Sequence, residues 1–502
     1  MNTPPQATVL HDLLLPNPLN ADRPAVTSAD ITLTRAELIS AANRYTAALH
    51  ARGLNRGDRL VITSDAGAPL VPVLFAASRL GVVFSVLHEQ VRGEVLQHVL
   101  ADCEPALVIA SSNATLDTAA AAGAPTLTPA DLEAEAETAP RLAEGVPAPL
   151  PVDPVCLIYT SGTTAMPKAV VSTHQQMMFA VHAIAERLQY RADDVVYCPL
   201  PLSFDYGLYQ VFLSALAGSH LWLGTAAESG PALLANLLRS QATVLPAVPP
   251  VSAALLRLLR RRGGDRPPLR LLTNTGAALP TDVPRGLREV LPDLRVQLMF
   301  GLTECKRLTI AEPDEDLQYP GSCGRPLTGT EVFVIDEEGE RLPAGEVGEI
   351  TVRGPNVMAG YWRRPDLTAS RFPRREGLFP ELRTGDYGWT DEAGRLYFAG
   401  RRDDIYKQDG FRVSAIEVEA AARRLSDVDT AAVLTPDATR PQAVLVITGS
   451  AEPSTVLPRL REHLEDYKVP AVCHAVTDLP VNANGKTAKD TLARQLTEAG
   501  RV

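Results

Sequence analysis

The sequence predicts an α/β protein with a large N-terminal domain, built on mixed and largely parallel sheets flanked by helices, and a small α+β C-terminal domain. Two observations predict this fold class. Short β-rich runs alternate with Ala/Leu-rich helical stretches along most of the chain. From about Gly385 this alternation gives way to a turn-rich stretch and a compact tail. A chain of 502 residues that is 45% hydrophobic can bury a large core and divide into two or more domains.

The first predicted helix follows Thr34. Thr34 and Glu37 have capping-box spacing, and apolar residues recur at helical intervals from there to Gly53. These apolar residues are Leu38, Ala41, Ala42, Tyr45 and Leu49. Further helices are predicted over PALLANLLRSQ, which begins at Pro231, and over SAALLRLLRRR.

Eight short runs between the helical stretches are rich in β-forming residues. They are RLVITS, VVFSVL, ALVIAS, VCLIYT, VVYCPL, SHLWLG, RLLTNTG and VQLMFG. Because strands that alternate with helices pair in the same direction, the pattern predicts parallel sheets.

Two regions depart from this alternation. Between Glu133 and Pro154 the composition shifts to Ala, Glu and Pro, which predicts a surface connection that carries no site. The turn-rich stretch TGDYGWTDEAGRLYFAGRRDD opens a compact tail of roughly one hundred residues. Within the tail we predict a helix from Ser414, strands over AAVLTP and AVLVITG, and a helix around LPRLREHLEDY.

The charge and the cysteines restrict the partners. The chain has 59 acidic and 48 basic residues and a formal charge of -11, which argues against nucleic acid or an anionic membrane as the main partner. The six cysteines are scattered and form no CxxC pair, so neither a disulfide framework nor a zinc site is predicted. The N-terminus has no basic region before an apolar run, and we predict a cytoplasmic protein without a membrane span.

The stretch TSGTTAMPKAV, Thr160 to Val170, predicts a site for a polyphosphate. A strand that ends in hydroxyl residues and glycine supplies N–H and O–H donors, and Lys168 adds a positive charge. The spacing differs from GxxxxGK[ST], so the loop is not the common P-loop. Taken alone, the stretch favours the polyphosphate site over the alternative, an ordinary polar loop that leaves a strand.

Four other segments follow this loop in a fixed order. They are FGLTE (Phe300 to Glu304), TGD (Thr384 to Asp386), GRRDDIYKQDGFR (Gly400 to Arg412) and NGK (Asn484 to Lys486). Together with the loop they resemble the adenylate-forming superfamily, which includes acyl-CoA synthetases, the adenylation domains of peptide synthetases, and luciferases. GEITVRGPNVMAGYW, Gly348 to Trp362, matches a further block, and the resemblance covers roughly residues 30 to 490.

The resemblance implies an acid-thiol ligase that works in two halves. A small-molecule carboxylic acid attacks the α-phosphate of ATP, with Mg²⁺, to give an acyl-adenylate and pyrophosphate. A thiol from CoA, or from the phosphopantetheine of an acyl carrier protein, then displaces AMP. The first half depends more on neutralising charge than on covalent help from the protein.

The resemblance also implies roles for individual residues. The β- and γ-phosphates are assigned to Thr160, Ser161, Gly162, Thr163, Thr164 and Lys168. Glu304 is assigned to Mg²⁺, Thr303 to the α-phosphate, Phe300 to the adenine, and Gly301, Gly276 and Ala277 to the same nucleotide site. Asp386 and Arg401 are assigned to the ribose, and Lys486 bridges the substrate carboxylate and the α-phosphate.

The resemblance divides the chain into domains 1–402 and 403–502, and the second rotates between the half-reactions about Asp403. One face presents Lys486 for adenylation and the other presents the loop around Lys407 and Gly410 for thioester formation. Without the family match, Asp403 is one more charge in RRDD and Lys486 is a surface lysine in a turn. Glu417 is left out of the site because Ser414 and Glu417 have capping-box spacing.

The segment PLSFDYGLYQVF bears on the acid. Phe204 stands where many acyl-CoA synthetases have histidine, whereas amino-acid-activating relatives have FDxS, with the aspartate on the ammonium group. Here Asp205 is present but Gly207 replaces the serine. The stretch from Thr275, which includes Gly276, resembles the acid-side wall of acyl-CoA synthetases. We favour a carboxylic acid without an amino group as the substrate, and keep as the alternative an amino acid that is loaded onto a carrier protein. The sequence does not determine the identity of the acid, the choice between CoA and a carrier protein, or the oligomeric state.

Two alanines in the predicted phosphate loop depart from the family pattern. Relatives usually carry Gly or Ser at the position of Ala165, and Gly at the position of Ala169. A methyl group there restricts positive φ and close approach to a phosphate, so one hypothesis is an enzyme weak in adenylation that forms thioesters from a preformed acyl-AMP. The other is that alanine is tolerated. A luciferase-like oxygenase shares the first step and no sequence feature favours it, while a non-catalytic relative would normally lack Glu304 or Lys486.

Overall fold

A computed structural model of the chain describes two compact units, Met1–Val332 with Val352–Leu382, and Phe333–Thr351 with Arg383–Val502. The described residues are all except 1–6, 16–19, 30, 64, 66, 68, 141, 143, 144, 161–165, 262, 263, 376–378, 402, 403, 409, 410, 438, 439, 465, 482–486, 501 and 502; the side chains of 226, 227, 405, 407, 411, 412 and 467 are also not described. No helix among the described residues has the length and apolar character needed to cross a membrane.

The first unit contains a seven-stranded sheet in the order β18-β8-β7-β4-β3-β5-β6. Its strands are β3 (Arg59–Thr63), β4 (Val83–Leu87), β5 (Leu107–Ile109), β6 (Thr126–Leu127), β7 (Pro154–Thr160), β8 (Lys168–Thr173) and β18 (Gly360–Tyr361). Strands β7, β4, β3, β5 and β6 pair in parallel, whereas β8 and β18 add to the edge in antiparallel fashion. The edge strand β18 comes from a distant part of the chain.

A nine-stranded sheet in the order β15-β14-β13-β12-β11-β9-β10-β1-β2 completes the first unit. Its strands are β1 (Pro24–Ser28), β2 (Ile31–Thr34), β9 (Val195–Cys198), β10 (His220–Leu223), β11 (Val244–Ala247), β12 (Leu271–Asn274), β13 (Arg295–Phe300), β14 (Thr309–Ile310) and β15 (Arg325–Pro326). The six strands from β13 to β1 pair in parallel, and antiparallel strands close both edges.

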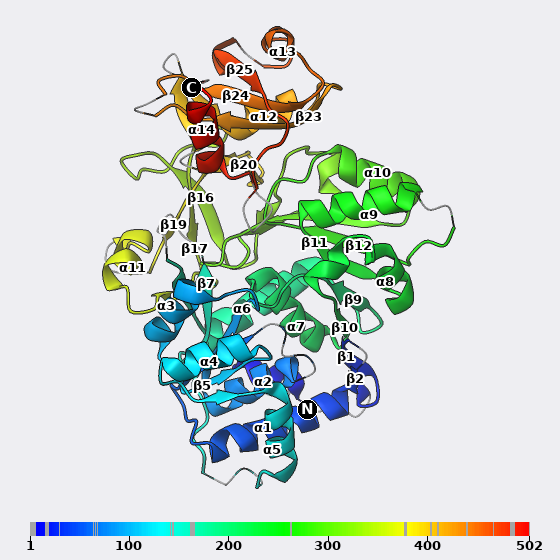
Figure 1. Cartoon of the computed structure of the whole chain (residues 1–502), viewed down its shortest axis with the longest axis vertical. Coiled ribbons are helices and arrows are strands. Elements are labelled where there is room, and N and C mark those ends of the chain that lie inside the picture. The colour runs from blue at the N-terminus through cyan, green and yellow to red at the C-terminus, as the bar shows by residue number, and fades with distance from the viewer. Residues whose placement is uncertain are drawn as a thin grey trace. The chain divides into compact units, whose positions relative to one another are not determined.

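Helices separate and cover these two sheets (Figure 1). They are α1 (Arg35–Ala51), α2 (Leu70–Leu80), α3 (Gly93–Cys103), α4 (Asn113–Ala121), α5 (Pro129–Thr138), α6 (His174–Leu188), α7 (Asp205–Ala217), α8 (Leu233–Ser240), α9 (Pro249–Arg261), α10 (Asp282–Val290) and α11 (Pro365–Arg371), with 3₁₀ turns η1 (Leu10–Leu14), η3 (Ala226–Ser229) and η4 (Glu315–Leu317). Helices α1, α2, α6 and α7 share one apolar cluster with inner faces of both sheets, α8 to α10 cover the outer face of the nine-stranded sheet, and α3 and α4 cover that of the other.

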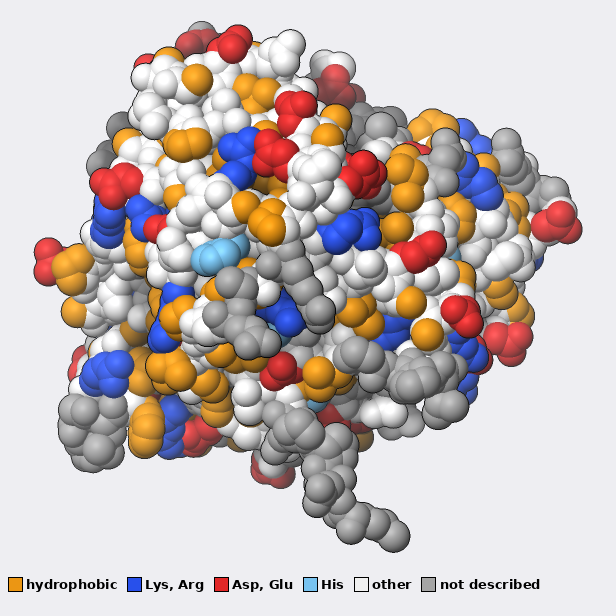
Figure 2. All heavy atoms as spheres, turned by 90° about the horizontal axis from the view of Figure 1, so that it is seen from below, with side chains coloured by type: hydrophobic (Ala, Val, Ile, Leu, Met, Phe, Trp, Pro, Cys, Tyr) orange, Lys and Arg blue, Asp and Glu red, His pale blue; other side chains and the backbone are white. Residues whose placement is uncertain are grey.

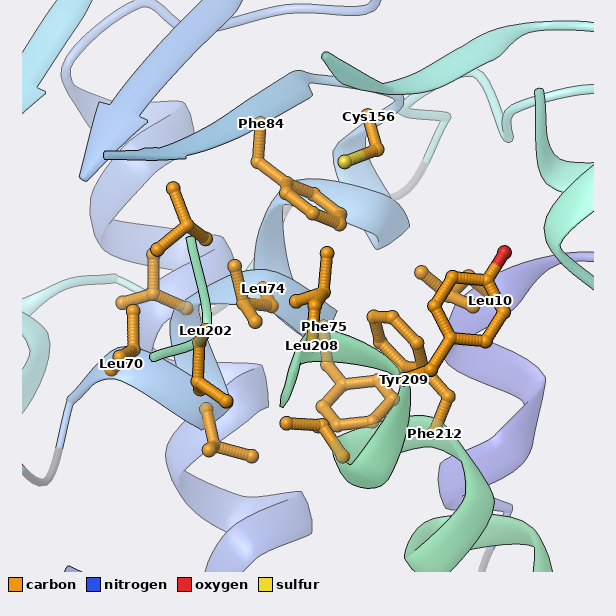
Figure 3. Packing of buried hydrophobic residues seen from close by; sticks show 14 of the residues in the cluster. Leu10, Leu70, Leu74, Phe75, Phe84, Cys156, Leu202, Leu208, Tyr209 and Phe212 are labelled. Atoms are coloured by element: carbon orange, nitrogen blue, oxygen red, sulfur yellow. The ribbon is translucent and has the colours of Figure 1, made fainter. Parts of the chain in front are cut away.

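Successive side chains along each strand point to opposite faces of the sheet and so pack into different layers. In β3, Leu60 and Ile62 belong to the central cluster, whereas Val61 between them belongs to the outer one. Figure 3 shows the central cluster, in which Phe75 of α2 meets Phe212 of α7 edge to face, with ring centroids 6.0 Å apart. The core therefore fixes α7, whose first residue is the site candidate Asp205.

The second unit consists of three small sheets, in the orders β16-β17-β19-β20, β21-β22 and β23-β24-β25. Their strands are β16 (Glu331–Ile335), β17 (Gly348–Arg353), β19 (Leu382–Thr390), β20 (Leu396–Arg401), β21 (Ile405–Gln408), β22 (Phe411–Ser414), β23 (Val428–Leu434), β24 (Val444–Gly449) and β25 (Val472–Ala475). The helices are α12 (Ala415–Ala422), α13 (Pro453–Leu460), the 3₁₀ turn η7 (Asp466–Lys468) and α14 (Lys489–Glu498).

The predicted fold class is confirmed, and each of the eight β-rich runs contains a strand. The capping box is also confirmed, since the Thr34 hydroxyl accepts from the Glu37 N–H and the Glu37 carboxylate accepts from the Thr34 N–H. The predicted domain boundary between residues 402 and 403 falls within the second compact unit and stays a prediction. Over the face shown in Figure 2, acidic and basic side chains are interspersed among apolar ones.

Three local predictions were wrong. The supposed connection from Glu133 begins as the second half of α5, because Ala and Glu are good helix formers and Ala136 is buried. The turn-rich stretch is the antiparallel hairpin of β19 and β20, in which buried and part-buried residues alternate along most of β19 and the pairing shifts once, between Tyr387 and Gly388. The last helix predicted around residues 457–467 ends at Leu460, followed by the short turn η7, so its apolar face is only two turns long.

Candidate functional site

The predicted phosphate loop connects the two strands of a hairpin, β7 and β8. Thr160 ends β7 and pairs with Lys168, the first residue of β8. The hairpin therefore brings the first hydroxyl residue and the lysine of the motif opposite each other. The other predicted phosphate contacts, Ser161, Gly162, Thr163 and Thr164, lie outside the described residues together with Ala165.

Tyr361 connects Lys168 to Glu304. Its hydroxyl donates a hydrogen bond of 2.7 Å to Glu304 Oε1, and the Lys168 Nζ lies 4.3 Å from the centroid of its ring. Burial raises the pKa of Tyr361, so the phenol keeps the proton that it donates. Burial lowers the pKa of Lys168, and the charge of Glu304 acts in the opposite direction.

Sequence reasoning missed Tyr361. The residue comes from the block GPNVMAGYW, and strand β18 places it opposite Val170 of β8. The block itself was recognised as a family feature, but nothing in its letters indicates that one hydroxyl reaches a carboxylate 57 residues earlier in the chain. A β-pairing between distant segments is what brings the two together.

Ala169 lies in the body of β8 and not in the loop. Its side chain is 1% exposed and belongs to an apolar cluster, and its carbonyl accepts a hydrogen bond from the Trp362 N–H. It pairs with Tyr159 in a regular antiparallel register. Positive φ is therefore not required at this position, and the argument that a methyl group hinders phosphate binding does not apply to Ala169.

Glu304 stands on a tight loop that follows Phe300, the last residue of β13, and that includes Gly301 and Thr303. A Cβ at Gly301 would lie 2.1 Å from the Lys306 carbonyl oxygen, so only glycine permits this approach. The buried Asn356 donates through Nδ2 to the carbonyls of Cys305, at 3.1 Å, and Arg307, at 3.0 Å. A close contact within the loop and one distant residue, Asn356, thus hold residues 301 to 307 in one conformation.

Two cations follow Glu304 inside the protein. Lys306 is fully buried, adopts φ +63°, and its Nζ has no hydrogen-bond partner among the described residues. Arg307 is 5% exposed, and its Nη1 lies 3.0 Å from Asp205 Oδ2. Burial lowers the pKa of Lys306, whereas the charge of Asp205 raises it. Neither cation was singled out from the sequence, because two basic residues in a row are usually solvated.

Asp205 and Phe204 begin α7. The Asp205 carboxylate finds its donor in Arg307, whose guanidinium also lies 4.7 Å from the ring centroid of Tyr206. Phe204 is 47% exposed and its ring lies 6.5 Å from that of His88. A Cβ at Gly207 would lie 2.5 Å from the Pro201 carbonyl oxygen, which explains why no serine stands there.

The carboxyl ends of β11 and β12 meet α7 through Tyr206. Its hydroxyl lies 2.7 Å from Thr273 Oγ1 and accepts a hydrogen bond of 3.2 Å from the Ala247 N–H. Just beyond β12, Gly276 adopts φ +89°, and the carbonyl of Ala277 accepts from Asn274 Nδ2 at 3.3 Å. Ligands of parallel α/β sheets usually bind at this edge, so the wall predicted around Gly276 lies at a suitable place.

The predicted ribose residues belong to the second unit. Asp386 of β19 and Arg401 of β20 are direct partners in the antiparallel register, with Nε and Oδ1 3.5 Å apart. Asp386 is 4% exposed, whereas the Arg401 side chain is 64% exposed. The Asp386 N–H donates to Thr384 Oγ1, which fixes the strand conformation at the carboxylate.

The remaining C-terminal candidates are only partly described. Asp403, Gly410 and Lys486 lie outside the described residues. Lys407 stands in β21 opposite Arg412, and its side chain is not described. Ser414 caps α12 by accepting from the Glu417 N–H, but the other half of the predicted capping box is wrong, because the Glu417 carboxylate pairs with Lys468 at 2.9 Å.

Comparisons with known proteins agree with this organisation. Residues 18–362 match the model of the AMP-binding enzyme family, and residues 417–486 match that of the AMP-binding enzyme C-terminal domain. The chain is 30% identical over 482 residues to a feruloyl-CoA synthase of Amycolatopsis sp, covering 94% of this chain and 95% of the relative. It is 29% identical to the L-proline–[L-prolyl-carrier protein] ligase of Streptomyces coelicolor, with 93% of each covered.

A third relative and two solved structures extend the comparison. The chain is 31% identical, over 94% of its length, to the probable non-canonical nonribosomal peptide synthetase CymA of Salinispora arenicola, and spans only 6% of that protein. VinN in complex with L-aspartate is 38% identical, with a TM-score of 0.71 over 78% of this chain and 98% of VinN. ATP-bound MatB from Rhodopseudomonas palustris is 27% identical, with a TM-score of 0.85 over 98% of this chain and 100% of MatB. The chain therefore belongs to the adenylate-forming family of AMP-binding enzymes and is an AMP-forming ligase.

Proposed function

We propose that the chain joins a carboxylic acid to a thiol through an acyl-adenylate. The carboxylate attacks the α-phosphate of ATP and releases pyrophosphate, and a thiolate then attacks the acyl carbonyl and displaces AMP. The observation that carries the proposal is the contact of Glu304, Tyr361 and Lys168, which places a carboxylate and an ammonium group beside one ring. A triphosphate that binds together with a divalent cation needs both charges within reach.

Glu304 fits the needs of Mg²⁺. This cation is commonly held by one or two carboxylates together with phosphate oxygens and water. The Tyr361 hydroxyl donates a hydrogen bond to Oε1 of Glu304, and no described residue donates a hydrogen bond to Oε2. The described residues contain no group of three or more His, Cys, Asp or Glu side chains that could form a complete protein cage. When bound, Mg²⁺ neutralises phosphate charge, and Lys168 adds a second positive charge beside it.

Other residues keep the roles that the family resemblance implies. We assign Phe300, Gly301, Gly276 and Ala277 to the adenine side of the nucleotide, Thr303 to the α-phosphate, and Asp386 with Arg401 to the ribose. Lys486 is assigned to adenylation, Lys407 to thioester formation and Asp403 to the hinge. For the ribose pair, the supporting observation is that a buried carboxylate faces an exposed guanidinium across two strands.

The acceptor is a phosphopantetheine thiol in either of its two forms, CoA or a carrier protein. Relatives of both kinds support this assignment, since a feruloyl-CoA synthase and an L-prolyl-carrier protein ligase each align over more than nine-tenths of this chain. The two forms present the same sulfur to the acyl-adenylate. They differ only in what surrounds the pantetheine.

An amino acid is the second candidate for the acid, beside a non-amino carboxylic acid. It is favoured by Asp205, a carboxylate at the position where amino-acid-activating relatives bind the ammonium group. It is also supported by VinN, a relative whose structure contains L-aspartate. The ion pair between Asp205 and Arg307 means that an ammonium group is not needed to balance the aspartate.

Pyrophosphate release with ATP and a panel of acids tests the proposal, followed by mass spectrometry of the products with CoA or a phosphopantetheinylated carrier. Glu304→Gln and Lys168→Met should each lower the rate of release by at least about 100-fold, because each removes one charge that faces the phosphates. Glu312→Gln is the matched control, since Glu312 forms an exposed ion pair with Arg187. Oxygen uptake without a thioester product would instead indicate an oxygenase, and undiminished release by Glu304→Gln would remove the proposal.

A further inference from the structure

Lys306 is an unusual lysine for a protein interior. Lysine is almost never fully buried without a partner, because a buried cation loses its hydration and must regain it from ligands or counter-ions. Yet Lys306 is 0% exposed and its Nζ has no hydrogen-bond partner among the described residues. The hydroxyl of Tyr209, a residue that is 1% exposed, is likewise unpartnered, and its ring centroid lies 5.8 Å from Nζ. Two orphaned polar groups thus lie close together, and Figure 3 shows one of them, Tyr209, within the central cluster.

The charges around Lys306 do not balance. Asp205 is the carboxylate whose charge raises the pKa of Lys306 most, and it already binds Arg307 at 3.0 Å. The charge of Glu304 also acts on Lys306, but it acts on Lys168 as well. Two carboxylates therefore serve three cations, and the group lacks one negative charge.

The cluster lies where a substrate acid would bind. Asp205 is the first residue of α7, and Lys306 and Arg307 follow the carboxyl end of β13, the edge at which parallel sheets bind ligands. The Asp205 side chain is 16% exposed and the preceding Phe204 is 47% exposed, so this end of the cluster reaches the surface. Phe204 and Asp205 are also the residues that the family resemblance relates to the acid.

The lysine is held in this position by its backbone. Its φ of +63° is unfavourable for a residue with a side chain, and it persists because the Asn356 amide binds the carbonyls on both sides of Lys306. Gly301 allows the Lys306 carbonyl to approach closely. Backbone strain of this kind is concentrated at ligand sites, where surrounding contacts enforce it.

We propose that Lys306 binds a second carboxylate on the substrate, so that the acid that is activated is a dicarboxylic acid. The inference rests on the proposed function and names the substrate class for the same site. The second carboxylate supplies the missing negative charge and accepts from Nζ and from the Tyr209 hydroxyl, while Arg307 keeps Asp205 in place. If the acid also carries an amino group beside that carboxylate, Asp205 is positioned to accept from it.

ATP–pyrophosphate exchange by the full chain tests the inference with matched pairs of acids that differ by one carboxylate. The pairs are succinate with butanoate, glutarate with pentanoate, and aspartate with 3-aminobutanoate. We expect kcat/KM to be at least about 100-fold higher for one dicarboxylic acid than for its partner, because a monoacid leaves a buried cation unpaired. Comparison of aspartate with succinate shows whether the amino group contributes.

Variants of Lys306 separate binding from folding. Lys306→Met should lower kcat/KM for the dicarboxylic acid at least about 100-fold, through a higher KM, and leave the monoacid within about threefold, while Lys306→Arg restores part of the preference. If Lys306→Met does not fold, the comparison of acids on the native chain decides the question alone. Exchange that is fastest with monoacids, or a preference that survives in a folded Lys306→Met, overturns the subsite and leaves the proposed function intact. Absence of exchange with every acid overturns the proposed function, and the subsite with it.

Discussion

The hydrogen bond between Tyr361 and Glu304 gives a direct measure of how the site is assembled. Tyr361→Phe removes one oxygen and keeps the ring over which the Lys168 Nζ lies at 4.3 Å. The lost bond of 2.7 Å is to a carboxylate, and bonds to charged groups contribute about 1.5–3 kcal/mol. If Glu304 must hold this orientation to bind Mg²⁺, the loss corresponds to a fall in kcat/KM of roughly 10- to 150-fold.

The assay is pyrophosphate release at several Mg²⁺ concentrations. Because the perturbed group is the proposed metal ligand, we expect the apparent KM for Mg²⁺ to rise in Tyr361→Phe. The matched control is Tyr190→Phe, which removes another hydroxyl of the first unit, the donor of a 2.8 Å bond to Gln210. The control should lose about 1 kcal/mol of stability and keep its Mg²⁺ dependence.

Either of two results would refute this reasoning. If Tyr361→Phe releases pyrophosphate within about threefold of the native rate, with an unchanged Mg²⁺ dependence, then orientation of Glu304 by Tyr361 does not matter for adenylation. A rate loss that appears equally in Tyr190→Phe would refute it as well, because it would trace the effect to general destabilisation.

Three further perturbations follow from the same contacts. Asn356→Ala leaves two buried carbonyls without donors. Its free energy of unfolding in urea should therefore be about 3 kcal/mol lower, and its rate of pyrophosphate release should fall as well. A variant as stable as the native chain would contradict this. Ala169→Gly should cost about 1 kcal/mol of stability without speeding pyrophosphate release, because Ala169 is a buried strand residue; a faster release would revive the hypothesis of hindered adenylation. Burial lowers the pKa of His174 from 6.5 to about 4. Between these two pH values His174 takes up a proton in the unfolded chain but not in the folded one. The contribution of His174 to native stability should therefore fall by about 2 kcal/mol from about pH 7 to about pH 5. His174→Gln, which can still accept from the Leu10 N–H, should lose about 2 kcal/mol less stability over this range than the native chain.

The fold was predictable where local pattern and burial agree. The strands of both large sheets are short runs of β-branched and apolar residues, and their alternation with helices fixes the parallel pairing. The capping box of α1 was readable because it needs only two residues three positions apart. The α5 helix was missed because its Ala/Glu composition is shared by helices and by surface connections, and only the burial of Leu132 and Ala136 decides between them.

The site was predictable only in part, and the reason is geometric. Motifs that are contiguous in sequence, such as the one containing Glu304, can be recognised from their letters. Tyr361, Asn356 and Lys306 act through partners that lie dozens of residues away, or through the absence of any partner. A basic residue after a family motif looks like a solvated charge until the structure shows that it is buried.

The loop from Gly301 to Arg307 couples two tasks on one rigid segment. Glu304 turns toward Tyr361 on the proposed nucleotide side, and Lys306, two residues later, lies near Tyr209 on the proposed acid side, where the charge of Asp205 acts on it. Because Asn356 and the Gly301 contact fix the backbone between them, the spacing of these two groups cannot adapt to the substrate. An acid whose second carboxylate is held at Lys306 must then reach the α-phosphate with its first, and we expect the rate of adenylation to fall steeply when the chain between the two carboxylates is lengthened or shortened by one methylene.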